Sequence, residues 1–327
     1  MKKLVSALVF LIVSFWFTNV SASHIIGHDM NWRNLGNDSF LISVQLYRDC
    51  NGIGKNFTTS IKTTSSCRTF NSILNIDDAN RDITPVCKEQ CTNCSNSSCS
   101  FKYGISIYTG YVLVVLDEER KNNCCWVNIS FSNCCLIGRY TNISSSPSFY
   151  SDIQLNVCES SGLESPEFDT APIRFACLGR DVKGSLWPSN MDSTQSQSTF
   201  TFSFDTIRSA KNSYIFQKSP YLFNMPLNHY GFPNNGSDPR GFNLDSTTGA
   251  LRFRPMREGM YAYAIKIEQR HKGKLIGVTS RLLSEIVIKC PNNSPKIEII
   301  QITSHHAGRL QVGNTIKQFV HLGEHYR

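Results

Sequence analysis

Residues 241–270 read GFNLDSTTGALRFRPMREGMYAYAIKIEQR, and this stretch decides the fold. Apolar and polar residues alternate in 242–244 and again in 251–253, which predicts two short strands. Between them, Asp245 begins a turn and Gly249 stands where a positive φ is expected. The stretch therefore opens as a tight antiparallel meander.

A third strand follows in the same stretch. Pro255 ends the second strand, because proline cannot donate a hydrogen bond to a ladder. From Met260 onward the period is two. One face carries Tyr261, Tyr263, Ile265 and Ile267, and the other carries Ala262, Ala264, Lys266 and Glu268. We expect the first face to be buried and the second to face water, which is typical of an antiparallel β-sandwich. The stretch thus predicts an all-β scaffold and indicates no chemistry.

The N-terminus predicts export. Lys2 and Lys3 precede an apolar run at residues 4–17, and Val-Ser-Ala at residues 20–22 fits a cleavage site. Residues 1–22 are therefore predicted to be a signal peptide that leaves Ser23 first. An uncleaved membrane anchor is the alternative, but the run is short for a span. No later segment is long and apolar enough to be a transmembrane segment.

The charge of the chain does not indicate a nucleic-acid partner. The formal net charge is +8, and removing Lys2 and Lys3 lowers it by two, to +6. The other basic residues are scattered rather than clustered, as on an ordinary solvated surface. An exported protein also rarely meets nucleic acid, so no nucleic-acid partner is expected.

The chain has thirteen cysteines, and none of them lies in the predicted signal peptide. In an exported chain this number predicts a disulfide-rich protein, in which the odd cysteine is free, intermolecular or differently bonded. Cys87, Cys91, Cys94 and Cys99 form the densest group. Thiolates at such spacing can close a zinc site, but export favours a disulfide-stapled loop without metal.

Other cysteines are predicted to pair over longer distances. Adjacent cysteines occur at 124–125 and 134–135, and each is expected to reach a different partner because short loops strain disulfide geometry. Cys177 and Cys290 are predicted to bond each other. No cysteine lies between them, and they sit near the first and last strands of a predicted second domain, which can be neighbours in a sandwich.

One segment copies part of a calcium-loop spacing. Asp78, Asn80 and Asp82 alternate, and Glu89 follows eleven residues after Asp78. Ile83 occupies the position where that loop needs glycine, so an Asx-rich turn is the competing interpretation. No cofactor and no other metal site is expected.

Composition divides the mature chain into two predicted domains. A Cys-rich sandwich covers 23–162, a Ser/Gly/Glu-rich linker lies at 160–167, and a second sandwich covers 163–290. Residues 291–327 are interpreted as a tail or as the truncated start of a further β domain. Further strands are predicted at 42–46, 58–63, 70–76, 112–117, 126–131, 200–204, 275–276 and 285–289.

No linear catalytic motif is present: the chain lacks G-x-S-x-G, H-E-x-x-H, P-loop and dinucleotide patterns. The carboxylate pairs at 77–78 and 118–119 are expected in solvated turns rather than in acid–base work. His305–His306 is expected to be solvated as well. Trp187 could stack on a sugar, although aromatic residues in an all-β chain usually belong to the core.

Several stretches resemble one family. Residues 23–27 read SHIIG and residues 46–52 read LYRDCNG, and the wording of 241–270 follows a GF-LD-TG-L-F-P-G-Y pattern. Together with the vicinal pair at 134–135 and PIRFAC at 172–177, they resemble the large secreted or cell-surface proteins of Bacteroidetes that carry Ig-like or PKD-type, gliding-motility-associated β domains. The resemblance reaches to about residue 295.

The resemblance implies two Ig-like or cadherin-like β-sandwich domains and a role at the cell surface, including adhesion. His28 replaces the usual second glycine of the family opening. Residues 190–204 do not have the Asp-rich pattern that the family often carries there, so this chain departs from any calcium binding that the family implies.

The sequence therefore predicts a non-catalytic module of a secreted or cell-surface protein, acting as a spacer or in adhesion, with other surface proteins or glycans as partners. A glycan-binding module is one alternative and would show an aromatic platform on an exposed sheet face. A secreted hydrolase is the other, and it would show a deep cleft with perturbed titratable groups.

Overall fold

The computed structural model describes eight segments: residues 24–52, 57–86, 90–99, 101–143, 148–191, 195–290, 309–312 and 315–318. The chain divides into two compact units, Met1–Ile288 and Lys289–Arg327. In the second unit, β17 (Arg309–Val312) pairs antiparallel with β18 (Thr315–Gln318). The predicted signal peptide and the histidine pair at 305–306 lie outside the described residues.

The first unit is built of strands with one short helix in its described part, which confirms the all-β class. In chain order the elements are β1 (Ile25–Gly36), β2 (Ser39–Asp49), β3 (Phe57–Thr64), β4 (Thr69–Asp82), β5 (Ile105–Val115), α2 (Asp117–Lys121), β6 (Trp126–Cys134), β7 (Ser148–Asn156), β8 (Ile173–Cys177), β9 (Val182–Ser185), β10 (Ser198–Asp205), β11 (Arg208–Ala210), β12 (Ser213–Tyr214), β13 (Asn243–Leu244), β14 (Ala250–Phe253), β15 (Gly259–His271) and β16 (Lys274–Ile288).

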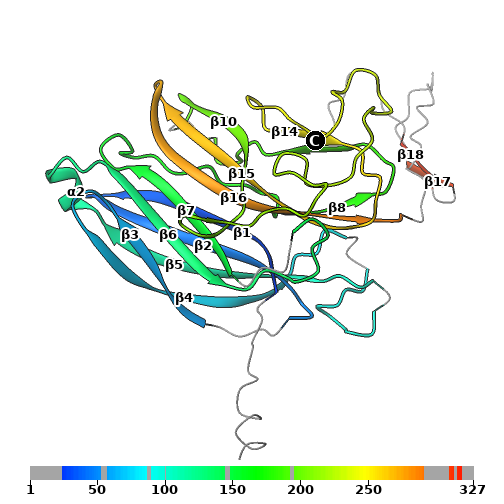
Figure 1. Cartoon of the computed structure of the whole chain (residues 1–327), viewed down its shortest axis with the longest axis horizontal. Helices are drawn as coiled ribbons and strands as arrows, with labels where there is room; N and C mark the ends of the chain where they lie inside the picture. Colours follow the sequence, from blue (N-terminus) through cyan, green and yellow to red (C-terminus); the bar gives the residue numbers. More distant parts are fainter. Residues whose placement is uncertain are drawn as a thin grey trace, which may run out of the picture. The chain divides into compact units, whose positions relative to one another are not determined.

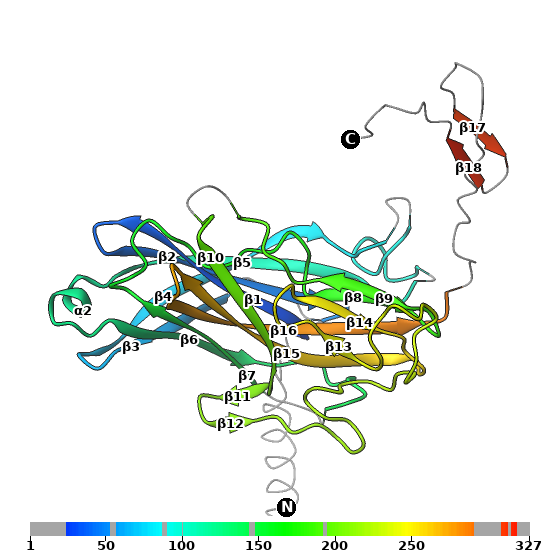
Figure 2. The same ribbon diagram turned by 90° about the horizontal axis from the view of Figure 1, so that it is seen from above.

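Most of these strands join one sheet whose hydrogen-bonded path closes on itself. The path runs β16–β1–β2–β5–β4–β3–β6–β7, and β7 pairs again with β16. Figure 1 shows these blue to green strands below the orange β16, and Figure 2 shows them from above. Their inward residues, such as Trp32, Phe40 and Phe149, form the first hydrophobic core.

A second hydrophobic core lies on the other side of β15 and β16. β10 extends the large sheet beyond β15, and β8 pairs with β16 in parallel. A small sheet, ordered β13–β14–β9, covers them (Figure 1). Phe202, Phe242, Leu251 and Tyr263 are among the side chains that fill the space between the two sheets.

The β15–β16 hairpin belongs to both cores. Tyr261 and Tyr263 point into the second core, whereas Ala262 and Ala264 point into the first. The expectation that the alanine face of β15 is wet is therefore wrong over this part of the strand. The reason is that a second layer of strands, far away in the sequence, covers that face. Lys266 begins the more open part.

The predicted linker is packed against β1 and does not separate two bodies. Ser165 N donates to Trp32 O at 2.8 Å, and Asn34 N donates to Leu163 O at 3.1 Å. Ser160 and Ser165 are buried. Residues before and after the predicted boundary at 162/163 thus belong to the same compact unit, which has two cores.

The strand predictions hold with two differences in detail. The turn after β13 has the expected form, since Gly249 has a φ of 66° and Asp245 Oδ1 accepts from Thr248 N at 2.7 Å. The continuous apolar run in the predicted 112–117 strand indicates burial on both faces, but Leu113 and Val115 are exposed, so the strand has one open face. The two predicted closing strands are one continuous strand, β16.

Disulfides staple the described part of the chain, as predicted. The bridges are Cys50–Cys94, Cys67–Cys124, Cys91–Cys99, Cys125–Cys158 and Cys134–Cys135. Cys177 and Cys290 are also disulfide-bonded, and Cys87 lies outside the described residues. The adjacent cysteines 124 and 125 reach different partners, as expected. The expectation is wrong for 134 and 135, which bond each other across a cis peptide bond that holds their Cα atoms 3.1 Å apart.

Candidate binding pocket

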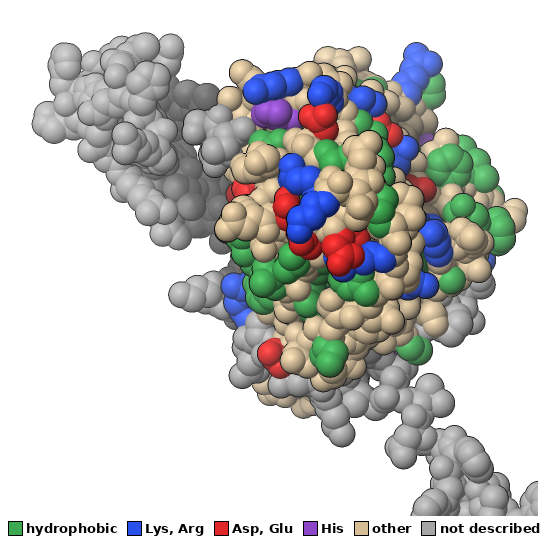
Figure 3. Space-filling model, turned by 90° about the vertical axis from the view of Figure 1, so that its left-hand side faces the viewer, with side chains coloured by type: hydrophobic (Ala, Val, Ile, Leu, Met, Phe, Trp, Pro, Cys, Tyr) green, Lys and Arg blue, Asp and Glu red, His purple; other side chains and the backbone are tan. Residues whose placement is uncertain are grey.

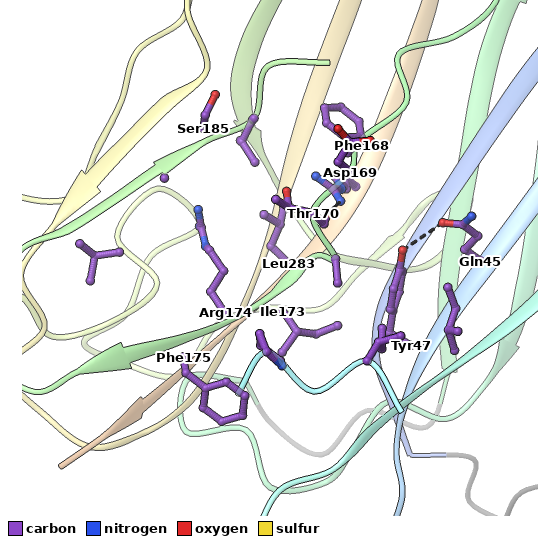
Figure 4. Close-up of a pocket in the computed structure, with 18 of the residues that line it drawn as sticks. Gln45, Tyr47, Phe168, Asp169, Thr170, Ile173, Arg174, Phe175, Ser185 and Leu283 are labelled. Atoms are coloured by element: carbon purple, nitrogen blue, oxygen red, sulfur yellow. Dashed lines mark hydrogen bonds between the residues drawn. The ribbon is translucent and has the colours of Figure 1, made fainter. Parts of the chain in front are cut away.

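A cavity of about 760 Å³ lies where the two cores meet. It is bounded on one side by β8 and β9, and on the other by β2, β4 and β5, while β16 and residues 168–171 complete it (Figure 4). Its lining includes Gln45, Tyr47, Arg81, Ile83, Ile107, Phe168, Asp169, Thr170, Ile173, Arg174, Phe175, Val182, Lys183, Gly184, Ser185, Leu186, Arg281 and Leu283. The volume falls in the range of small-ligand sites.

A buried ion pair supports one wall of the cavity. Arg281 Nε donates to Asp29 Oδ1 at 2.6 Å, and Arg281 Nη2 donates to Thr170 O at 2.5 Å. Tyr47 Oη donates to Asp29 Oδ2 at 3.1 Å, and burial raises the pKa of Tyr47. The Arg281 guanidinium also lies 4.1 Å from the centre of the Phe168 ring. This wall is therefore held rigidly by charge-assisted hydrogen bonds.

A second buried arginine crosses from β8 toward β9. Arg174 Nε donates to Glu285 Oε1 at 2.7 Å, and Arg174 Nη2 donates to Tyr263 Oη at 2.6 Å. Burial raises the pKa of Glu285, and the Arg174 guanidinium opposes that rise. A Cβ on Gly184 would collide with Arg174 Nη1, so only glycine leaves room for this arginine. Figure 4 shows the Arg174 side chain extending toward the strand that carries Ser185.

The cavity has more basic than acidic side chains. Arg81, Lys183, Arg174 and Arg281 line it, against the carboxylate of Asp169 alone among its described lining residues. Two of the arginines have buried carboxylate partners outside the lining, and Lys183 pairs with Asp238 at 2.9 Å. Arg81 makes no ion pair with the described residues, so its guanidinium is the basic group of the lining that can meet an anionic ligand, and the Asp169 carboxylate opposes it.

The Glu285 carboxylate is closed off from the cavity. Glu285 is completely buried and does not line the cavity, and its Oε1 is bonded to Arg174 and Tyr263. A molecule bound in the cavity would therefore not reach Glu285, the carboxylate bonded to Arg174 and Tyr263. The lining combines apolar side chains with polar and charged ones, among them Tyr47, Asp169 and Arg81, and such a lining can bury and orient a ligand.

The calcium candidates are not gathered into a loop. Asp78, Asn80 and Asp82 lie on β4, in extended rather than turn conformation. The side chains at 78 and 80 and all of Glu89 lie outside what the structure describes. Asp82 Oδ1 accepts from Thr84 N at 2.9 Å. Among the described residues, no group of three or more His, Cys, Asp or Glu side chains could hold a metal ion.

The carboxylate pairs occupy other environments than expected. Asp77 and Asp78 lie in β4 and not in a loop. Glu119, on α2, is fully buried and accepts from Arg68 Nε at 2.8 Å, so the expectation of a solvated pair is wrong for this residue. Its partner lies 51 residues away, which is why local polarity misled the prediction. Trp187 is partly exposed and packs edge-on against Phe200.

The exposed apolar side chains form no aromatic platform on the described β2–β5–β4 face. Ile73 on β4 and Leu113 on β5 are exposed aliphatic residues, and Tyr111 is an exposed aromatic residue on β5. Exposed aromatic side chains occur instead between β12 and β13, including Phe216, Phe223 and Phe232. At the end of the unit that carries α2, Figure 3 shows acidic and basic side chains interspersed.

Sequence reasoning did not find the cavity. Its lining comes from segments that are far apart, for example Tyr47, Arg174 and Arg281, and no local pattern links them. The GS pair at 184–185 on β9 was the one local signal, because glycine inside a strand often marks close approach of another group.

Comparison with known proteins adds no assignment. No family model matches the chain, and no curated protein and no solved structure matches it. In the described part of the chain, no helix has the length and apolar character needed to span a membrane.

Proposed function

We propose that the chain is a non-catalytic module of a secreted or cell-surface protein, and that it binds another surface protein through the cavity between its two cores. Three observations support this proposal. The cysteines are disulfide-bonded, as in proteins of oxidising compartments. The cavity is large and has more basic than acidic side chains in its lining, and Glu285, a buried carboxylate whose pKa is raised, is sealed away from it.

The last of these observations speaks against Glu285 as a catalytic acid or base. Acid–base catalysis needs a titratable group within hydrogen-bond reach of the substrate. Glu285 has no exposed surface, and its Arg174 and Tyr263 partners hold it in the protein interior. A glycan partner finds less support than a protein partner, because the exposed side chains of Phe216, Phe223 and Phe232 lie in the segment between β12 and β13 and not on a sheet face.

A binding experiment tests the proposal. The mature chain is labelled with a fluorophore and added to cells of its source organism, and bound label is measured by flow cytometry. We expect saturable binding that the variant Ser185→Trp abolishes, because Ser185 is exposed and lines the cavity. Ser132→Trp is the matched control: Ser132 is exposed on β6 and lines a different groove. Equal binding of both variants and the parent would refute the role of the cavity.

Export is tested separately. N-terminal sequencing of the exported chain should begin at Ser23, after removal of residues 1–22. A mature chain that still begins at Met1 would show that the signal-peptide interpretation is wrong.

A further inference from the structure

We propose that the free edge of β9 binds an extended, acidic segment of a partner protein, which adds to the small sheet as a fourth strand within the cavity. This inference rests on the proposed function, because it names the kind of partner that the cavity takes. Addition of a peptide strand to an open sheet edge is a general mode of recognition.

The first observation is that β9 has an unpaired edge. β9 ends the small sheet β13–β14–β9 and pairs with β14 alone among the described strands. Leu186 N donates to Gly249 O at 2.9 Å, so the backbone groups of Leu186 face β14. Along an antiparallel strand, the backbone groups of successive residues face alternately toward and away from the partner strand. The N–H and C=O groups of Gly184 thus face β14, and those of Lys183 and Ser185 face the open side. An edge of this kind is a template for another strand.

The second observation is that this edge borders the cavity. All residues of β9 line the cavity, together with Leu186. A strand of four residues is about 13 Å long. The cavity, at about 760 Å³, offers space beside this edge. Apolar side chains such as Phe168 and Ile173 stand across from it and can pack against alternate residues of an added strand.

The third observation concerns charge. Arg174 uses Nε and Nη2 for Glu285 and Tyr263, and no hydrogen bond to a described residue uses its Nη1. That atom lies over the face of β9 at Gly184, the face on which alternate side chains of an added strand would also stand. Arg81, which makes no ion pair with the described residues, lines the same cavity. An acidic side chain on the added strand would meet these two guanidinium groups, whereas exposed Asp169 opposes it from the lining.

Together these observations select an extended acidic segment. Backbone pairing supplies affinity that does not depend on sequence, and the arginines favour carboxylates at alternate positions. A peptide in which valine alternates with glutamate has both properties, because successive side chains of a strand point to opposite faces.

The experiment uses the full mature chain and a blocked, fluorescein-labelled octapeptide of alternating valine and glutamate, with binding followed by fluorescence anisotropy. We expect saturable binding that weakens at least tenfold when lysine replaces glutamate. Two further peptides carry backbone N-methyl groups, either on every valine or on every glutamate. Only one of these patterns blocks the N–H groups that face β9, so the two affinities should differ at least tenfold.

Equal affinities of the two N-methylated peptides would overturn strand addition. A peptide that is buried in the cavity without backbone pairing to β9 would bind equally well with either methylation pattern. Complete competition by free glucuronate together with such equality would identify the site as one for small anions.

Variants of the protein sharpen the test. Arg81→Gln should lower the affinity for the valine–glutamate peptide and leave the affinity for a valine–glutamine peptide unchanged. Lys272→Gln is the control of equal charge change, in the turn between β15 and β16. An equal loss of affinity for the valine–glutamate peptide in both variants would contradict the role of Arg81. If Ser185→Trp abolishes cell binding but the N-methyl patterns bind equally, the proposed function stands and strand addition fails.

Discussion

Arg281 and Asp29 form an ion pair inside the protein, 252 residues apart in the sequence. Arg281 Nε lies 2.6 Å from Asp29 Oδ1, and the two side chains are 1% and 5% exposed. Arg281 is on β16 and Asp29 is on β1, so the pair joins the last strand of the first unit to its first strand. Both charged groups are desolvated, and each compensates the charge of the other in the interior.

Removal of one partner should therefore be costly. In Arg281→Met the Asp29 carboxylate stays buried without its cation, and we expect a loss of about 3–5 kcal/mol in the free energy of unfolding. The double variant Asp29→Leu with Arg281→Met should recover most of this loss, because an apolar pair avoids the desolvation of two charges. Urea unfolding followed by fluorescence measures both.

An exposed ion pair provides the control for this prediction. Lys274 and Glu159 lie 2.8 Å apart with side chains 66% and 39% exposed. Lys274→Met should change the free energy of unfolding by less than about 1 kcal/mol. Equal losses for the single Arg281→Met variant and the double variant would show that the unpaired carboxylate is not the cause.

His28 should make stability depend on pH. It is buried in the first core and stacks on Phe149 with ring centres 5.3 Å apart. Burial lowers the pKa of His28 from 6.5 to about 4. Asp29 and Asp152 oppose this shift, while Arg208 and Arg281 add to it.

The sign follows from proton binding. Between pH 6.5 and pH 4 the unfolded chain binds a proton at His28 and the folded chain does not, so the free energy of unfolding falls as the pH falls. One pKa unit corresponds to about 1.4 kcal/mol, so His28 contributes at most about 3 kcal/mol over this window. Urea unfolding at pH 7, 6, 5 and 4 should show this slope, and His28→Phe should flatten it. The same slope in both proteins would contradict the assignment.

The strands were predictable because their side-chain pattern is local. Ile42, Val44 and Leu46 alternate with polar residues and are buried on β2, and the tyrosine face of β15 is buried as expected. The opposite face of β15 was not predictable. Ala262 and Ala264 are compatible with a wet face or with a tightly packed one, and strands far away in the sequence decide between them.

The candidate site was not predictable for a related reason. Polar residues such as Glu119 and Ser165 look solvent-exposed in the sequence, but a distant arginine and a distant backbone group satisfy them in the interior. The cavity itself depends on the approach of β8 and β9 to the first core. Sequence patterns describe one element at a time, whereas the cavity is a property of the contact between elements.

Asn142 takes the place of a missing neighbour strand along β15. It is fully buried, its Nδ2 donates to Ala262 O at 2.7 Å, and its Oδ1 accepts from Ala262 N at 2.9 Å. β10 pairs with β15 only from Ala264 onward, so these backbone groups have no partner on β10. Asn142→Ala should lower the free energy of unfolding by about 2–4 kcal/mol, because two buried backbone groups lose their bonds.

Asn122 offers the matched control for that measurement. Its Nδ2 also donates to a backbone oxygen, Glu118 O, but at an exposed site where water can replace it. Asn122→Ala should therefore change the free energy of unfolding by less than about 1 kcal/mol. A small effect of Asn142→Ala, equal to that of Asn122→Ala, would mean that water reaches Ala262.

Cys177 and Cys290 are predicted to bond each other. Both are disulfide-bonded, and Cys177 ends β8 opposite Ile288 on β16, two residues before Cys290. The chain between them exceeds a hundred residues, so the chain-entropy model gives up to about 4–5 kcal/mol of stabilisation, against about 2–3 kcal/mol for the short loop of Cys91–Cys99. Replacing Cys177 and Cys290 by serine should therefore lower the melting temperature more than replacing Cys91 and Cys99. Peptide mapping under non-reducing conditions should recover Cys177 linked to Cys290, and recovery of either one linked to Cys87 would show that the pairing is wrong.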